Sequence, residues 1–189
     1  MIVETERFEA LIDAILAIII TIIVMEIPLP ETTSLVSFIK LYPEIIAYTL
    51  SFIICFDVWL YHHNLFNLVN KLNSTVTWTS AISMMIIGLL PHVTTMISLN
   101  FYSFTAQAMF GLIFFLTNLN FYIVDKLLIR IDKANIALKI ALNIRRKITI
   151  YTCIIQIIGF IVGYLVYPPF ILVTCILSIL LNFIFKACD

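Results

Sequence analysis

The sequence predicts an all-α integral membrane protein with six transmembrane helices. Of its 189 residues, 62% are hydrophobic, and the mean hydropathy is +1.11, whereas only about half of the residues in a soluble domain are apolar. A membrane-spanning helix needs about 20 mostly apolar residues, and six stretches of the chain reach or approach that length. We therefore expect residues 1–189 to form a single six-helix membrane domain. The predicted spans are 8–28, 42–66, 76–98, 102–125, 147–167 and 170–186.

The distribution of lysine and arginine predicts how this domain is oriented. Six spans place both termini on one side, and loops rich in these residues stay in the cytoplasm. Lys40 alone falls on the opposite side. This ten-to-one asymmetry predicts cytoplasmic N- and C-termini, and it explains the basic linker 126–147 without a nucleic-acid partner. The ten residues on the cytoplasmic side are Arg7, Lys71, Lys126, Arg130, Lys133, Lys139, Arg145, Arg146, Lys147 and Lys186.

Proline positions justify the ends of the first two spans. The first span stops at Pro28-Leu29-Pro30, because proline lacks an N–H donor and disfavours helix in the residue before it. The second span opens with Pro43, which suits a first helical turn, and with Glu44, whose charge favours the positive end of the helix dipole. Glu44 therefore has a structural explanation.

The sequence gives fewer indications of where the later spans bend and end. Gly88 and Pro91 predict a bend in the outer half of the third span, and the short link near Asn100 predicts an antiparallel hairpin with the fourth span. Isoleucines at helical spacing in the linker 126–147 suggest an amphipathic continuation of the fourth helix. The last two spans meet at Pro168-Pro169.

The first span carries the residues that point most directly to a function. Ile18, Thr21, Ile22 and Met25 are three or four residues apart and share one helical face. Repeated around a symmetry axis, that face would form a narrow apolar constriction with one polar ring, as in the wall of an ion pore. The alternative is that an isoleucine-rich face contacts lipid or packs against another helix.

Charged residues within the spans need partners, because burying a charge in the hydrocarbon region is costly. Asp13 lies about 8 Å from the inner end of the first span, and Trp59, His62 and His63 lie at a similar depth in the second. We expect Asp13 to bond one of the histidines, with the Trp59 indole N–H nearby. We interpret these residues as a structural contact that joins the first two helices, or as a proton sensor. For Asp57, deeper in the second span, the pattern leaves a hydrogen bond, a protonated carboxyl and a cation site open.

No enzyme, cofactor or metal site is expected. Adjacent His62 and His63 are about 100° apart on a helix and cannot chelate as an i, i+4 pair does. The sequence has no His-Glu-x-x-His, Gly-x-Ser-x-Gly or phosphate-binding glycine loop. A catalytic function therefore has no visible set of residues.

One series of residues runs through the first half of the chain. It begins with Arg7 and, after three intervening residues, Leu11-Ile12-Asp13, and continues with Ala17-Ile18, Thr21, Val24 and Glu26-Ile27 before a proline. Ser51-Phe52, Trp59-x-x-His62-His63 and Leu89-Leu90-Pro91 follow. This series resembles the bacterial homologues of the lysosomal potassium channel transmembrane protein 175. That family opens with Arg-x-x-x-Phe-Ser-Asp, so Leu11 and Ile12 replace its Phe and Ser.

The resemblance implies a passive potassium-permeable channel in the bacterial plasma membrane, built as a homotetramer with the first helix around a central pore and without a carbonyl selectivity filter. It places the constricting isoleucine at Ile18 and the pore threonine at Thr21, with Ile22 and Met25 as further hydrophobic levels. Potassium and other monovalent cations would be the permeant partners, and the lipid bilayer would surround the tetramer. The resemblance makes five residues a scaffold or gating network: Arg7, Asp13, Trp59, His62 and His63.

One alternative of a different class is a proton-coupled secondary transporter. Such a protein could pass protons along Asp13, Asp57 and the histidines at positions 62 and 63. The sequence lacks the inverted repeat and the glycine-broken helix pair that are typical of many transporters.

Overall fold

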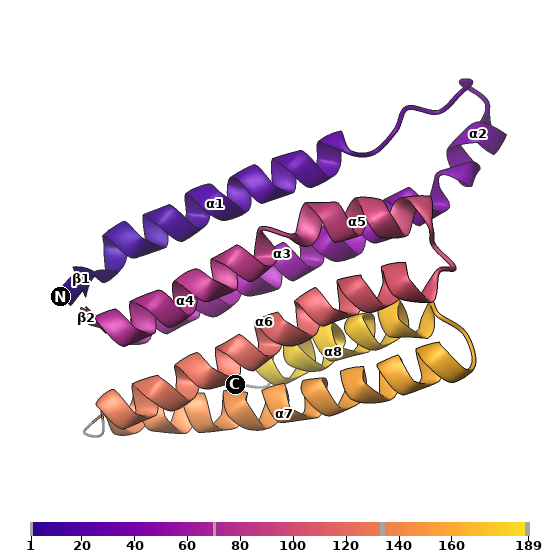
Figure 1. Cartoon of the computed structure of the whole chain (residues 1–189). Coiled ribbons are helices and arrows are strands. Elements are labelled where there is room, and N and C mark those ends of the chain that lie inside the picture. Colours follow the sequence, from indigo (N-terminus) through magenta and orange to yellow (C-terminus); the bar gives the residue numbers. More distant parts are fainter. Residues whose placement is uncertain (1, 70, 133–134, 188–189) are drawn as a thin grey trace.

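Within the residues described, 2–69, 71–132 and 135–187, the computed structural model is almost entirely helical. The chain runs back and forth along one long axis (Figure 1). We call its two ends the N-terminal end, where α1 begins, and the α2 end, where the chain crosses from α1 to α3. The helices are α1 Thr5–Met25, α2 Leu35–Lys40, α3 Tyr42–Leu68, α4 Ser74–Ile87, α5 Leu90–Leu99, α6 Phe104–Ile131, α7 Ile136–Leu165 and α8 Phe170–Ala187.

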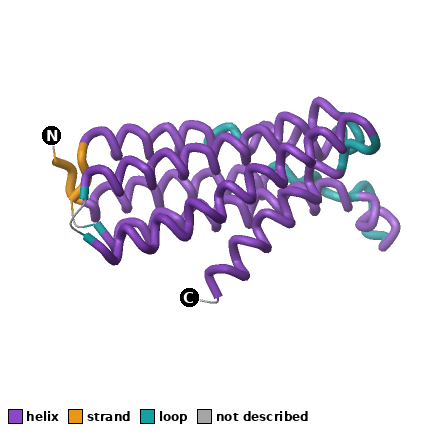
Figure 2. Tube along the Cα trace, turned by 90° about the horizontal axis from the view of Figure 1, so that it is seen from below, coloured by secondary structure: helices purple, strands orange, loops and turns teal. Residues whose placement is uncertain are grey.

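A short antiparallel strand pair, which no pattern in the sequence predicts, closes the N-terminal end. Strand β1, Ile2–Glu4, pairs with β2, Lys71–Asn73, with Ile2 opposite Asn73. Figure 2 shows the strands beside the N-terminus. The pair connects the beginning of α1 to the link between α3 and α4.

The proline-marked end of the first span and start of the second agree with the structure. Helix α1 stops at Met25, before the prolines, and α3 carries Pro43 and Glu44 in its first turn. The third predicted span is divided into α4 and α5 around Gly88, and Pro91 lies in the first turn of α5. The expected interruption in this span is therefore confirmed.

In the described residues, five helices are long and apolar enough to cross a membrane, with α4 and α5 counted as one. Helix α8 is shorter, at 18 residues. At 1.5 Å per residue it is about 27 Å long, slightly less than the hydrocarbon core. It ends well short of the N-terminal end of the bundle (Figure 1).

The basic linker 126–147 is not a separate segment. Helix α6 continues to Ile131, and α7 already begins at Ile136, so these residues are divided between two helices that pack against each other. The Asn135 side chain caps α7 by accepting a hydrogen bond from the Leu138 N–H at 3.0 Å. Leu138 and Leu142 of α7 are buried in this packing, whereas three of the isoleucines at helical spacing, Ile136, Ile140 and Ile144, are exposed. Lys133, one of the basic residues of this region, lies outside the described residues.

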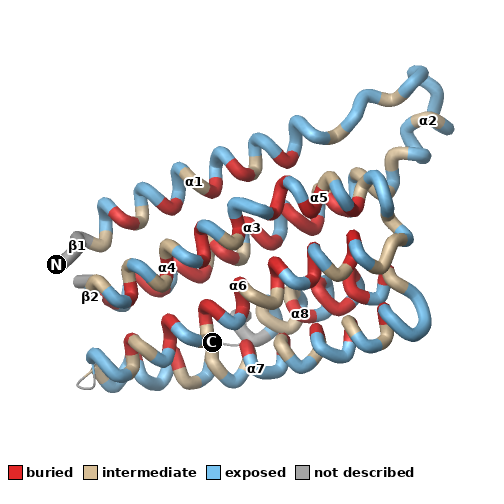
Figure 3. The backbone as a smooth tube through the Cα atoms, viewed as in Figure 1, coloured by how far each residue is buried: buried red, intermediate tan, exposed pale blue. Residues whose placement is uncertain are grey.

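The core lies between the helices in the middle of the bundle, whereas α1 and α7 keep one long face exposed (Figure 3). Helices α7 and α8 pack very closely through two glycines four residues apart. A Cβ atom at Gly159 would lie 2.0 Å from Thr174 Oγ1, and one at Gly163 would lie 2.7 Å from Ile171. Small residues at this spacing let membrane helices approach each other.

Candidate functional site

Helix α1 has one packed face and one exposed face. The packed face, which lies against α3 and α5, consists of Phe8, Ile12, Leu16, Ile19 and Ile23. Only 28% of the apolar stretch of α1 is buried, the lowest value among the five candidate spans, which otherwise range from 33% to 50% in the described residues. Helix α1 is thus the candidate span that the subunit itself covers least.

The four residues predicted to share a face of α1 lie on the exposed side. Ile18 is 59% exposed, Ile22 42% and Met25 83%, and Thr21 is also exposed. The Thr21 hydroxyl donates to the Ile18 carbonyl oxygen at 2.7 Å. Because that hydroxyl has already donated its proton, its oxygen presents lone pairs outward, as a cation ligand would.

A polar contact fixes α1 against α3 in the N-terminal half of the bundle. The Trp59 indole N–H donates to Asp13 Oδ1 at 2.9 Å, as expected from their depths in the two spans. One turn away on each helix, His63 Nδ1–H donates to Glu9 Oε1 at 3.0 Å. The rings of Trp59 and His63 stack at 5.1 Å with an interplanar angle of 10°. Two hydrogen bonds therefore connect the helices at this level, and the ring stack holds together the two α3 side chains that make them.

The expected bond between Asp13 and a histidine is wrong. In this antiparallel pair, Trp59 faces Asp13, so the next turn of α3 meets the previous turn of α1 and brings His63 to Glu9. Asn67 Nδ2 then donates to His63 Nε2 at 3.2 Å. The error came from matching the depths of the two helices without this one-turn offset.

His62 points away from α1 and into the bundle. It is 1% exposed, and its Nδ1–H donates to the Val58 carbonyl oxygen at 2.9 Å. Its ring packs edge-on against Tyr61 and Phe121. Its Nε2 atom has no hydrogen-bond partner in the described part of the chain. The two histidines thus face different neighbours, and the described residues contain no group of three or more His, Cys, Asp or Glu that could hold a metal.

The fifth residue of the expected scaffold, Arg7, lies exposed at the start of α1. It is one turn before Leu11, which is 53% exposed, and helical spacing places both on the same side as Ile18. The structure therefore brings together Asp13, Trp59 and His63 but leaves Arg7 outside this group.

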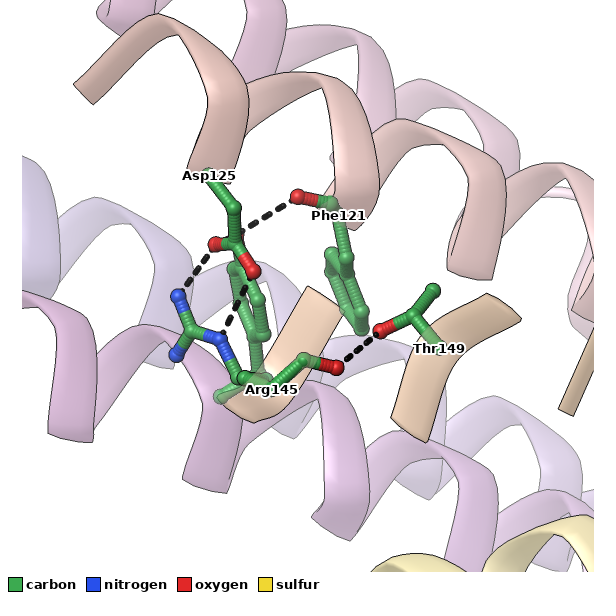
Figure 4. A network of polar contacts seen from close by, with 5 residues as sticks. Phe121, Asp125, Arg145 and Thr149 are labelled. Carbon is green, nitrogen blue, oxygen red and sulfur yellow. Dashed lines mark hydrogen bonds and ion pairs between the residues drawn. The ribbon is translucent and has the colours of Figure 1, made fainter. Parts of the chain in front are cut away.

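A second network, which sequence reasoning missed, is buried between α3, α6 and α7 (Figure 4). Arg145 Nε donates to Asp125 Oδ2 at 3.0 Å, and a terminal guanidinium nitrogen bonds the other carboxylate oxygen. The Tyr61 hydroxyl donates to Asp125 Oδ1 at 2.9 Å. The guanidinium lies 4.2 Å from the Tyr61 ring centroid, and that ring stacks on Phe121 at 3.6 Å. The charges are therefore paired, hydrogen-bonded and covered by aromatic rings.

This network corrects one interpretation of the sequence and adds to another. Arg145 appeared only as one of many basic residues on the cytoplasmic side, yet its side chain is 20% exposed and that of Asp125 is fully buried. Asp57, whose role the sequence left open, acts electrostatically on Arg145, and Tyr61, one turn after it on α3, bonds Asp125. The sequence signal for this pair was an acid at the end of the fourth predicted span, Asp125, and an arginine two residues before the fifth, Arg145.

A third polar group lies where α1, α3 and α5 meet at the α2 end. The Thr95 hydroxyl lies 3.1 Å from Glu26 Oε2, to which it can donate. These two residues line a small pocket, and Glu44 lines the same pocket. Deeper in the bundle, the Ser51 and Thr94 hydroxyls are 2.7 Å apart. These contacts hold the last turn of α1, which carries Met25, close to α5.

The family and the relatives that match this chain are described as potassium channels. The family described as endosomal/lysosomal potassium channel TMEM175 matches residues 7–91. A potassium channel from Chryseobacterium sp. (strain P1-3) is 33% identical over 141 residues, which cover 75% of this chain and 73% of the relative. A potassium channel from Chamaesiphon minutus (strain ATCC 27169 / PCC 6605) is 33% identical over 101 residues, half of each chain.

One solved structure matches almost the whole fold. It is the crystal structure of a lysosomal potassium-selective channel TMEM175 homolog from Chamaesiphon minutus, with a TM-score of 0.81. The match covers 95% of this chain and 96% of that chain, at 22% sequence identity. At that identity the likeness establishes the fold, and it includes α7 and α8, which the family match over 7–91 does not reach.

Proposed function

The chain belongs to the TMEM175 family of potassium channels, and from this premise we propose that it is a passive, potassium-permeable cation channel of the bacterial plasma membrane. The observation that carries the proposal is the exposed face of α1, where Ile18, Thr21, Ile22 and Met25 follow one another along the helix. In this proposal the face lines the ion pathway.

The pathway requires more than one subunit. A single helix face encloses no pore, and a ring closes only when copies are arranged around an axis. We propose a homotetramer of six-helix subunits, each a single membrane domain of residues 1–189, with both termini in the cytoplasm and with α8 as the sixth crossing. The low burial of α1 within one subunit supports this arrangement, because in a tetramer the open face would lie against neighbouring copies and along the pore.

Ile18 forms the constriction in this proposal. Four isoleucine side chains offer no oxygen to replace the water shell of an ion, so the ring conducts when it is wide enough to be wet and closes when it dewets. The Thr21 hydroxyl oxygen lies one turn further along and can ligate a partly dehydrated cation. Potassium loses its water more easily than sodium, so such a ring favours potassium. Ile22 and Met25 continue the hydrophobic wall toward the α2 end.

The residues behind α1 determine where its exposed face points. The Trp59–Asp13 bond and the His63–Glu9 bond join α1 to α3 on the side away from the pore. A rotation of α1 that turned Ile18 away from the axis would break both bonds. Asp13, Trp59 and His63 are therefore positioning residues. His62 supports the same stretch of α3 from the core, and Arg7 lies at the mouth of the pathway.

The test is potassium and sodium flux into liposomes that hold the purified protein, for wild type and for Ile18→Asn. A ring of asparagines wets easily, so we expect faster flux and a smaller preference for potassium. The matched control is Ile158→Asn, which makes the same change on an exposed position of α7 and should leave flux and selectivity unchanged. Equal effects of the two substitutions, or no flux in any variant across several pH values and voltages, would reject the proposal.

The transporter alternative gains no support. The residues of its proton relay do not form one chain, since Asp13 bonds Trp59, Asp57 acts on Arg145, and His62 is enclosed by aromatic rings. The matched relatives are potassium channels. Saturable, proton-dependent flux that Asp57→Asn abolishes would be the observation in its favour.

A further inference from the structure

Helix α2 is a small ordered element that packs only lightly against α3 among the described residues and leaves its apolar side chains largely exposed. Ser34 caps it by accepting a hydrogen bond from the Ser37 N–H at 3.3 Å, and the Thr32 hydroxyl lies 2.7 Å from that of Ser37. Despite this ordered start, its large apolar side chains are half to four-fifths exposed. They are Leu35 at 81%, Val36 at 65%, Phe38 at 50% and Ile39 at 70%.

An open groove runs between α2 and the first turns of α3. Every residue that lines it is apolar or aromatic, and its volume is about 400 Å³. Such a concentration of exposed apolar surface marks a site of contact with another molecule or with a membrane. The groove is lined by Leu35, Phe38, Ile39, Tyr42, Ile45 and Ile46.

Three tyrosines lie at the α2 end of the bundle, at the same level as the groove. The Tyr42 and Tyr102 hydroxyls are 2.6 Å apart, and the ring of Tyr102 lies 6.1 Å from that of Tyr167. These three residues come from α3 and from the two other links at the α2 end. Tyrosine gathers where the hydrocarbon of a bilayer meets the headgroups. Because Tyr42 itself lines the groove, the groove opens at this boundary.

The helix that borders the groove ends in a lysine, which directly follows the groove residue Ile39 in the chain. Lys40 is in the last turn of α2 and is exposed, and its flexible stem lets the ammonium group reach the headgroup level. The nearby carboxylate of Glu44 lines the pocket toward α1 and α5 instead. An apolar groove bordered by a helix whose last turn carries an exposed lysine suits the two parts of a phospholipid, an acyl chain and a phosphate.

We propose that α2 is an interfacial anchor that holds one phospholipid of the leaflet on its side of the membrane. The acyl chain fills the groove between α2 and α3, and the lipid phosphate pairs with Lys40. The anchor fixes the connection between α1 and α3, and it stands independently of the ion pathway proposed above.

The test uses the full-length protein in vesicles of brominated phosphatidylcholine, which quenches nearby tryptophan fluorescence. Ile39→Trp places a reporter on the groove, and the signal of Trp59 and Trp78 is subtracted by using the parent protein in the same lipid. We expect bromines near the glycerol end of the acyl chain to quench the new tryptophan more strongly than bromines near the methyl end. The matched control is Thr33→Trp, in the polar stretch before α2, which should be quenched least.

Two further measurements separate the possible occupants. Lys40→Gln should reduce the number of phospholipids that each subunit retains in native mass spectra by one, and unchanged retention would reject the phosphate contact. Ile39→Cys should give no intersubunit cross-link beyond that of the parent protein. A new cross-linked band, or no quenching of the Ile39→Trp reporter by either lipid, would show that another copy or water covers the groove and would overturn the proposal.

Discussion

Replacing Asp125 with leucine should destabilise the bundle by about 3 kcal/mol. Removing one partner of a buried ion pair typically costs about 3–5 kcal/mol, because the remaining charge stays buried without compensation. The lower end applies, since the Arg145 side chain retains 20% exposure and Asp57 still acts on it. Tyr61 also loses its 2.9 Å acceptor. The free energy of unfolding can be measured by titrating detergent-solubilised protein with sodium dodecyl sulfate and following helix content.

The double variant Asp125→Leu/Arg145→Met makes this reasoning testable. Replacing both charges by apolar groups of similar size is often neutral or stabilising, so the double variant should recover most of the stability that either single variant loses. The matched control is Asp132→Leu, at an exposed position just after α6, which should change stability by less than about 0.5 kcal/mol. If the two single losses simply added in the double variant, the buried pair would not be the cause.

Three other substitutions test other parts of the structure. Gly159→Ala should cost about 1–3 kcal/mol in the same unfolding assay, because its Cβ would lie 2.0 Å from a threonine hydroxyl oxygen of α8, whereas Gly88→Ala meets only backbone atoms at 3.3 Å or more and should cost clearly less. Trp59→Phe keeps the aromatic ring but removes the bond to Asp13; it should lower the stability by about 1–3 kcal/mol and reduce liposome flux while leaving the potassium-to-sodium ratio unchanged. Thr21→Val removes the outward-facing oxygen and should reduce the potassium preference, which Thr21→Ser should retain; equal ratios in both variants would contradict a role for the hydroxyl.

Local chemistry made much of the helix pattern predictable. Proline residues marked the end of α1 and the start of α3, and Gly88 with Pro91 marked the break between α4 and α5. Proline and glycine change the backbone within a few residues of their own position, so their effect on helix ends can be predicted from the sequence alone. That Trp59 lies near Asp13 was also predictable, because depth along two antiparallel helices is a matter of counting residues, although the bond was expected to a histidine.

Contacts that depend on helix rotation and packing were not predictable in the same way. Pairing His63 with Glu9 requires knowing the axial offset of α1 and α3 to within one turn. The burial of Arg145 depends on α6 and α7 meeting beside α3, which the count of basic residues cannot reveal. The strand pair joins residues that are about 70 positions apart in the chain, and no periodic pattern marks it.

The central claim is that the exposed face of α1 lines the ion pathway, and cysteine accessibility along this helix tests it most directly. Single cysteines would be introduced at Ile18, Ile22 and Met25, and at the packed positions Ile19 and Ile23, and potassium flux would be measured before and after a water-soluble thiol reagent. The parent protein corrects for the native cysteines. We predict that modification blocks flux at the three exposed positions and has no effect at the two packed ones. Block at the packed positions, or none at the exposed ones, would contradict the account.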